Sequence, residues 1–320
     1  YPGDSVTVNA SNLTGTFVDK NVGTAKTVNI SGIVLAGTSS ADYQLSGGAN
    51  TTTTANITPA PLTITGANLT TTYNASAQSL ASPTVSGLIA GDNVVVAGGA
   101  TGTNAGTYTA AYTATGVDAG NYTVTANAPV LTINKASLVV TANNAATIYG
   151  QTDPALTASV SGLQGGDNSS VISPAYTLTR AAGVSTGTYA ITAAGPSSVS
   201  NYNITYVPGQ FTIAQAGSLL INLNAATTTY GTAATPTIAS VQYVNGSGQL
   251  TNFTTTGGNI YTDGIATTIT ITPSITGATV TSNVGAYANA VTGTYTGSTS
   301  NYTVVTTITN TLTKIGRAHV

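Results

Sequence analysis

The residues that could carry out chemistry are few and of few types. All eight acidic residues are Asp, Cys is absent, and the single histidine is His319. A pair of Asp carboxylates could serve as general acid and base in glycoside hydrolysis. However, Asp92, Asp118, Asp153 and Asp167 each lie within two residues of Gly, Asn or Pro, where a short carboxylate typically caps a turn. We therefore predict turn structure at these positions, and a protein that is not an enzyme.

Metal binding is the second chemistry that Asp could support. Calcium requires several oxygen ligands that converge on one ion, and the sequence has no Asp-x-Asp-x-Asp run. The absence of Cys excludes thiolate zinc sites, disulfides and cysteine nucleophiles. We predict no catalytic, metal-binding or cofactor-binding residue and no cofactor, while a calcium ion shared across a domain junction remains the alternative.

Seventeen tyrosines are the other group with recognition chemistry. Their rings could stack on sugars or fill a core. Six of them recur at two matching positions: Tyr73, Tyr149 and Tyr230, and Tyr122, Tyr202 and Tyr302. Recurrence in every copy of a unit favours core residues. Lys135 beside Asn134 could form an isopeptide bond only with a buried neighbouring carboxylate, and the sequence places none there.

The elements that would position these residues repeat about every eighty residues. Each unit has a Gly-Thr-Tyr-like step, then an Asn-Tyr or Asp-Tyr step, then a short apolar strand. The second step stands at Asp42-Tyr43, Asn121-Tyr122, Asn201-Tyr202 and Asn301-Tyr302. Four copies of one unit therefore follow one another, which is typical of proteins built for reach and display.

Alternation of apolar and hydroxyl residues predicts strands throughout, as in 62–65, 122–125, 130–133, 176–179, 202–206 and 268–271. No segment has the apolar spacing of an amphipathic helix. We predict an all-β fold: an elongated tandem array of small immunoglobulin-like β-sandwich domains, with β-grasp-like domains as the alternative.

The apolar strand that ends each copy places the domain boundaries. We predict repeat 1 at 1–61, repeat 2 at 62–136, repeat 3 at 138–216 and repeat 4 at 219–314. Repeat 1 lacks the strands that precede the Gly-Asp step in its relatives. Residues 315–320 depart from the composition of the rest and resemble the translation of a sequencing adapter. The linkers are only one or two residues long, so we expect successive repeats to hold a limited range of angles.

Composition narrows the class of protein. Charged residues make up 4% of the chain and the net charge is -2, so there is no basic surface for nucleic acid. Hydrophobic residues make up 41%, but no apolar run reaches the roughly 18 residues of a membrane span. The surface is therefore expected to consist of Thr, Ser, Asn and Gly.

Motifs of repeat 3 carry a family resemblance. Ile148-Tyr149-Gly150, Ser161-Gly162-Leu163, Gly166-Asp167 and Gly187-Thr188-Tyr189 are similar to the MBG domain of the Tyr-Gly-x type. Repeats 2 and 4 resemble it with departures, since Asn74 replaces the glycine and repeat 4 lacks the Gly-Asp step. Repeat 1, with Asp19-Lys20-Asn21-Val22-Gly23 and Ile57-Thr58-Pro59-Ala60-Pro61, resembles the related YDG domain.

This resemblance implies a secreted or bacterial cell-surface location, because such domains form repeat arrays in filamentous-haemagglutinin-like adhesins. The function that we expect is a structural stalk or adhesin segment of a bacterial exported surface protein. The alternatives are a module that binds a glycan or protein ligand of unknown identity, and an accessory region of a secreted hydrolase.

Overall fold

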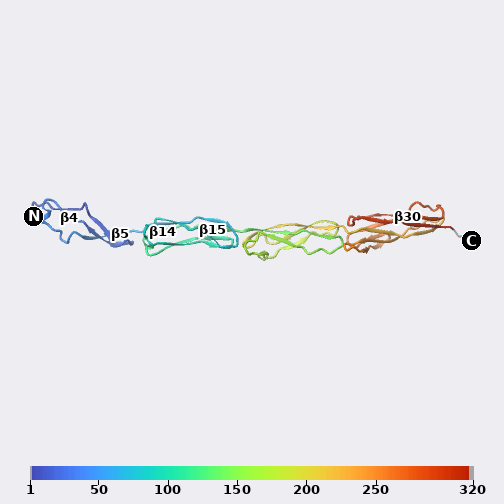
Figure 1. The fold of residues 1–320 in the computed structure, drawn as a ribbon, viewed down its shortest axis with the longest axis horizontal. Helices are drawn as coiled ribbons and strands as arrows, with labels where there is room; N and C mark the ends of the chain where they lie inside the picture. Colours follow the sequence, from blue (N-terminus) through green and yellow to red (C-terminus); the bar gives the residue numbers. More distant parts are fainter. Residues whose placement is uncertain (1, 317–320) are drawn as a thin grey trace. The chain divides into compact units, whose positions relative to one another are not determined.

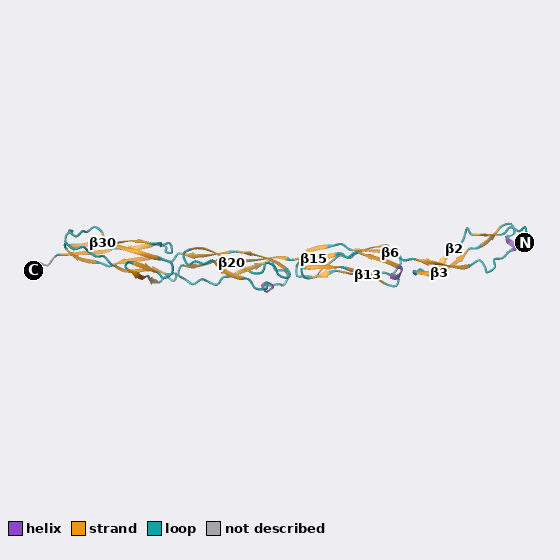
Figure 2. Cartoon of the chain, turned by 180° about the vertical axis from the view of Figure 1, so that it is seen from behind, coloured by secondary structure: helices purple, strands orange, loops and turns teal. Residues whose placement is uncertain are grey.

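The computed structural model describes residues 2–316, and their fold is all-β (Figures 1 and 2). Helical structure among the described residues is confined to three short 3-10 segments, η1 (Ser40–Asp42), η2 (Ala119–Asn121) and η3 (Ser169–Val171). None of the described helical segments is long and apolar enough to cross a membrane. The chain divides into two compact units, 1–136 and 137–320, each of which contains two of the predicted repeats.

Repeat 1, in the first unit, consists of five strands in two small sheets. The strands are β1 (Thr7–Asn9), β2 (Thr14–Phe17), β3 (Gly23–Ser31), β4 (Val34–Ala36) and β5 (Thr51–Ile57). One sheet has the order β2-β3-β5 and the other pairs β1 with β4. Only Val28 of this repeat is a buried apolar residue among those described. Repeat 1 therefore has little core of its own.

Repeat 2 completes the first unit. Its strands are β6 (Ala60–Thr65), β7 (Leu69–Thr72), β8 (Gln78–Ser79), β9 (Thr84–Ser86), β10 (Val95–Gly99), β11 (Thr101–Gly102), β12 (Gly106–Thr109), β13 (Ala111–Thr115), β14 (Tyr122–Ala126) and β15 (Val130–Asn134). The main sheets are β14-β6-β9 and β12-β15-β7. Leu62, Ile64, Leu131 and Ile133 lie buried on them. They form a core between the two sheets.

Repeat 3 opens the second unit with two sheets, β18-β16-β21 and β17-β22-β20-β19. Its strands are β16 (Ala136–Ala142), β17 (Ala145–Ile148), β18 (Ala158–Ser161), β19 (Thr177–Arg180), β20 (Gly187–Ala194), β21 (Tyr202–Val207) and β22 (Gly209–Ala214). Buried residues alternate with exposed ones along β16 and β22. This period of two is the one that a sheet packed on one face requires.

Repeat 4 has the largest sheets, β26-β25-β23-β31 and β24-β32-β30-β29-β28-β27. Its strands are β23 (Leu219–Leu223), β24 (Ala226–Thr229), β25 (Ile238–Val244), β26 (Leu250–Asn252), β27 (Thr254–Gly257), β28 (Ile260–Thr262), β29 (Thr268–Ile275), β30 (Gly285–Thr296), β31 (Val305–Ile308) and β32 (Asn310–Ile315). The hairpin of β27 and β28 accounts for part of its extra length.

Repeats 2, 3 and 4 share one arrangement. The second strand of each runs parallel to its last strand, in the pairs β7–β15, β17–β22 and β24–β32. The last strand also pairs antiparallel with the strand of the Gly-Thr-Tyr-like step, β12, β20 or β30. The residue that follows the second strand and the residue that precedes the strand of the Gly-Thr-Tyr-like step therefore lie at the same end of each repeat. We call this end the tail.

The tyrosine predictions are largely confirmed. Tyr73, Tyr122, Tyr149, Tyr202 and Tyr302 are all buried. The prediction is wrong for Tyr230, whose exposed fraction is 44%. Tyr230 follows β24 at the tail of repeat 4, as Tyr149 follows β17 at the tail of repeat 3, so the difference lies in what covers each tail.

Candidate functional site

Every repeat contains a tyrosine whose hydroxyl donates a hydrogen bond to an Asp carboxylate of the same repeat. The pairs are Tyr43 with Asp4 at 2.5 Å, Tyr122 with Asp92, Tyr202 with Asp167, and Tyr302 with Asp263, the last three at 2.6 Å. The tyrosine belongs to the Asn-Tyr or Asp-Tyr step in each case. We call the end of a repeat that carries this pair its head.

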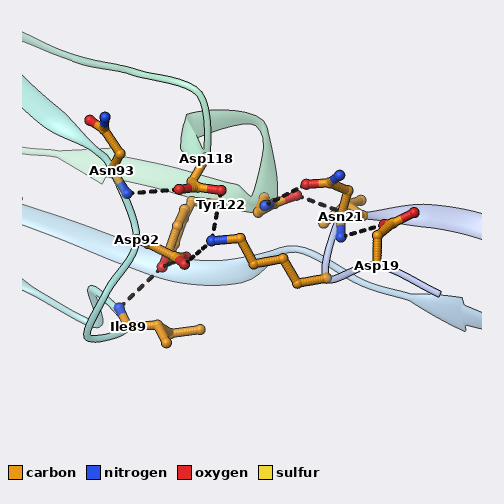
Figure 3. A network of polar contacts seen from close by, with 10 residues as sticks. Asp19, Asn21, Ile89, Asp92, Asn93, Asp118 and Tyr122 are labelled. Carbon is orange, nitrogen blue, oxygen red and sulfur yellow. Dashed lines mark hydrogen bonds and ion pairs between the residues drawn. The ribbon is translucent and has the colours of Figure 1, made fainter. Parts of the chain in front are cut away.

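In the first unit, the head of repeat 2 meets the tail of repeat 1. The Asn121 side-chain oxygen accepts the Val22 backbone N–H at 2.9 Å, and its amide nitrogen donates to the Asn21 side chain at 3.3 Å. Val22 directly precedes β3, and Asn121 directly precedes Tyr122. The Asn-Tyr step thus contributes one residue to the contact with the preceding repeat and one to the pair within its own repeat. Figure 3 shows Asn21 close to the loop that carries Asp118 and Tyr122.

A lysine adds charge to this first junction. The Lys20 ammonium lies 2.5 Å from an Asp92 oxygen and 2.8 Å from an Asp118 oxygen, and both carboxylates are nearly buried. Asp118 also accepts the Asn93 backbone N–H at 2.7 Å. Hydrogen bonds to Asp118 and Asp92 raise the pKa of Lys20, and the Lys20 bond lowers the pKa of both carboxyls. All three groups are therefore charged at neutral pH.

The second unit repeats the asparagine contact between repeats 3 and 4. The Asn301 side-chain oxygen accepts the Thr186 backbone N–H at 2.8 Å, and Asn301 is 4% exposed. The Thr186 hydroxyl also donates to the Ser300 carbonyl at 3.2 Å. Thr186 directly precedes β20, as Val22 precedes β3. One contact, between a backbone N–H of one repeat and an asparagine of the next, thus occurs in both units.

A tyrosine takes the place of the lysine in this last junction. The Tyr149 hydroxyl donates to the Asp263 carboxylate at 2.7 Å and accepts the Ala266 backbone N–H at 3.0 Å. Tyr149 has no exposed surface. Its ring stands edge-on to that of Tyr302, 5.8 Å between centroids, and Tyr302 contacts Tyr243 and Phe253 in turn. Tyr149 of repeat 3 therefore joins an aromatic cluster that belongs to repeat 4.

Burial and hydrogen bonding together set the pKa values of this cluster. Burial raises the pKa of Tyr149 to about 12 and raises the pKa of Tyr302 further. For Asp263, burial alone would raise the pKa, but hydrogen bonds from Tyr302 and Tyr149 outweigh it and leave the pKa lowered. Two neutral hydroxyls thus bind one ionised carboxylate at neutral pH.

The last junction is also closely packed. A Cβ added to Gly246 of repeat 4 would lie 2.8 Å from Cγ of Gln151 in repeat 3. A Cβ added to Gly150, which has a φ of +81°, would lie 3.2 Å from Cδ1 of Ile265. Glycine suits these positions, because a Cβ at Gly246 would force the Gln151 side chain to move and a side chain at Gly150 would be strained by its positive φ.

The carboxylates predicted to cap turns have other partners. Asp92 and Asp118 bind Lys20, Asp153 accepts Nε of Arg180 at 2.7 Å, and Asp167 accepts the Tyr202 hydroxyl. Asp118 precedes η2 and its side chain does not cap it. Turn structure is confirmed at Asp118, and Asp92 and Asp167 each close a turn. The prediction did not foresee the side-chain partners of these carboxylates. No group of three or more potential metal ligands occurs within residues 2–316.

Two residues escaped the sequence reasoning. Asp263 replaces the Gly-Asp step that repeat 4 lacks, and its position upstream of the Asn-Tyr step was the available signal. Lys314 was the other, and it is only 2% exposed. It is the strand partner of Gly285, the position that Ile133 and Ile213 occupy opposite Gly106 and Gly187 in repeats 2 and 3. Its ammonium donates to the carbonyls of Thr279, Val280 and Ser282.

A depression of about 930 Å³ lies in repeat 3, and its lining includes none of the junction residues named above. Its lining comprises Leu156, Thr157, Ala158, Asn168, Ser169, Ser170, Ile172, Ser173, Ala175, Tyr176 and Leu178. None of these residues is ionisable at neutral pH, so this surface offers no acid–base pair. The recurring asparagine contacts lie at the junction inside each unit, and these two junctions are therefore the candidate sites.

Two family models match parts of the chain. Residues 138–212 match the family model of the MBG domain (YGX type), and residues 1–54 match that of the YDG domain. The resemblance to MBG and YDG repeat domains is confirmed. MBG and YDG domains are repeat domains of surface adhesin-like proteins. No curated protein and no solved structure matches the chain.

Proposed function

We propose that the chain is a non-enzymatic stalk segment of a bacterial exported surface protein, and that the junctions fix the angle between successive repeats. The observation that carries this proposal is the asparagine contact that occurs in both units, Val22 with Asn121 and Thr186 with Asn301. Recurring polar contacts that hold successive repeats together suit a protein segment that must be long and stiff.

The alternatives have less support. A glycan-binding module needs exposed aromatic rings in a groove, whereas five of the six recurring tyrosines are buried. An accessory region of a secreted hydrolase is the remaining alternative, and a catalytic domain next to these repeats in the full-length protein would support it. The occurrence of these domains in extracellular adhesin-like proteins supports a location at the cell surface or in the medium.

Small-angle X-ray scattering of the 320-residue chain, extrapolated to zero concentration, tests the stalk. A compact chain of this length would have a radius of gyration of about 20 Å. Four β domains of ordinary strand length, set end to end, would give about 40 Å. We expect the larger value. A value near 20 Å would refute the stalk, whatever the junction contacts.

A further inference from the structure

In repeats 2 and 4, the chain enters at the head and leaves at the tail. Repeat 2 begins with β6, whose first residue Ala60 is the strand partner of Tyr122 at the head. It ends with β15, whose last residue Asn134 is the partner of Thr72 at the tail. The chain enters and leaves repeat 4 in the same way. Tension along the chain would therefore reach each of these repeats through its first and last strands.

The second and last strands of each repeat form a parallel pair, which we call its clamp: β7 with β15, β17 with β22, and β24 with β32. In repeat 2 the clamp has four residue pairs, and just beyond them the Tyr73 N–H donates to the Asn134 carbonyl at 2.8 Å. The same bond closes the other clamps, from Tyr149 to Ala214 at 2.9 Å and from Tyr230 to Ile315 at 3.0 Å. The recurring tyrosine therefore adds a backbone bond to all three clamps.

The direction of the strands decides how a clamp is loaded. Tension draws β7 towards the head through β6 and draws β15 towards the tail, so the two parallel strands are pulled along each other. The hydrogen bonds of a parallel pair are evenly spaced along the strands, and such a pull loads all of them together. Leu131 and Ile133 of β15 are 0% and 2% exposed, so sliding must also drag these side chains through a closely packed core.

We propose that repeats 2, 3 and 4 have a mechanical function, which is to bear tension along the chain, and that the clamp is the element that resists it. Unfolding under tension is governed by the unfolding rate, which the clamp keeps low because its bonds must break together. Resistance to pulling does not require a fixed angle between repeats. The clamp can therefore hold where scattering refutes the stalk, and it can fail where scattering supports the stalk.

Single-molecule force spectroscopy of the intact chain, pulled by its two termini, tests this proposal. We expect three high-force events, one for each clamp, and each should release about 3.5 Å of length per unfolded residue. The comparison is the same chain pulled through Val95→Cys and Thr115→Cys, since the natural chain has no Cys. These exposed residues are partners at the open end of the β10–β13 hairpin.

Pulling across Val95 and Thr115 breaks the bonds of the hairpin one pair at a time and leaves the clamp unloaded. We expect the first rupture in this direction at a severalfold lower force than the events seen when the termini are pulled. Equal rupture forces in the two directions would overturn the proposal, and so would the absence of high-force events between the termini.

A pair of proline variants isolates the clamp of repeat 2. Strand β7 lies at the edge of its sheet, and backbone groups point to alternate sides along a strand. Because the Tyr73 N–H faces β15, the Thr71 N–H faces β15 too, whereas the Thr70 N–H faces away. Thr71→Pro therefore removes a clamp hydrogen bond, and Thr70→Pro is the matched control, which an edge strand tolerates.

At a fixed load between the termini, Thr71→Pro should unfold one of the three repeats at least about fivefold faster, the effect of one lost hydrogen bond. The force needed across Val95 and Thr115 should stay unchanged in this variant, which also shows that repeat 2 is folded. Thr70→Pro should change neither measurement. Equal effects of the two prolines would contradict the clamp, and if Thr71→Pro prevents folding, the comparison of the two pulling directions still decides.

Discussion

The Tyr149 hydroxyl of repeat 3 lies 2.7 Å from the Asp263 carboxylate of repeat 4, on the same oxygen that accepts the hydroxyl of Tyr302. One carboxylate thus completes a pair within its repeat and a contact with the preceding repeat. In the first junction, Asp92 plays both parts, with Tyr122 as the internal donor and Lys20 as the external one. The acceptor is an Asp carboxylate in both junctions, whereas the donor from the preceding repeat is Lys20 in the first and Tyr149 in the last.

Loss of the asparagine contact should loosen the last junction. Asn301→Ala leaves the Thr186 N–H without its acceptor and the buried Thr267 hydroxyl without the Asn301 donor, which should cost about 1–3 kcal/mol of unfolding free energy. We expect faster hydrogen exchange at Thr186 and a lower midpoint in urea. Asn259→Ala, an exposed asparagine of the same repeat, is the control and should change neither. Unchanged exchange at Thr186 in Asn301→Ala would show that the contact does not hold the junction.

High pH should disrupt the last junction through Tyr149. Its pKa is raised to about 12 in the folded chain, above the value of about 10 that an unfolded tyrosine has. The stabilisation is therefore complete below pH 10 and is lost as the pH rises towards 12. Ultraviolet titration should show several late tyrosines, Tyr302 among them, and Tyr149→Phe should remove one of them. A titration curve that Tyr149→Phe leaves unchanged would contradict this assignment.

Acid should weaken the first junction. Lys20 lowers the pKa of Asp92 and Asp118, so their stabilising contribution is present above the unfolded value of about 3.9. It is lost as the pH falls through the lowered values. Hydrogen exchange at Val22, measured as a function of pH and corrected for intrinsic rates, should rise in that range.

The charge of Lys20 can be tested by substitution. Lys20→Met leaves Asp92 and Asp118 without their cation, so the carboxyls should protonate at higher pH and the loss of Val22 protection should begin at higher pH. Lys26→Met is the matched control, because Lys26 pairs with Asp19 inside repeat 1. Equal effects of the two substitutions would mean that Lys20 contributes only to the surface of repeat 1.

The sequence predicted the elements better than the contacts between repeats. The period-two segments at 62–65, 122–125 and 202–206 lie in β6, β14 and β21. Alternation reports one buried face in β6 and β21, whereas in β14 only Tyr122 is buried. The role of Asp263 was not predictable from the Gly-Asp motif, since repeat 4 lacks this motif and supplies the acceptor of the Tyr302 hydroxyl from a different sequence. Lys314 was missed because its ammonium is satisfied by backbone carbonyls, which no side-chain pattern reveals.

The buried state of Tyr149 also shows the limit of reasoning from one repeat. Its recurrence correctly indicated burial, but the surface that buries it belongs to the next repeat, and Tyr230 at the matching position is exposed. The repeat pattern therefore identifies which tyrosines correspond, whereas the burial of each depends on the repeat that packs against it.

The central claim is that the junction contacts hold successive repeats at a fixed angle, and a distance measurement within the second unit tests it most directly. The chain has no Cys, so Ser159→Cys in β18 and Thr272→Cys in β29, both exposed positions, would carry the only two spin labels. Pulsed electron resonance should give a single narrow distance distribution that broadens when Asn301→Ala and Tyr149→Phe are added. A broad distribution in the chain with both contacts intact would contradict the account.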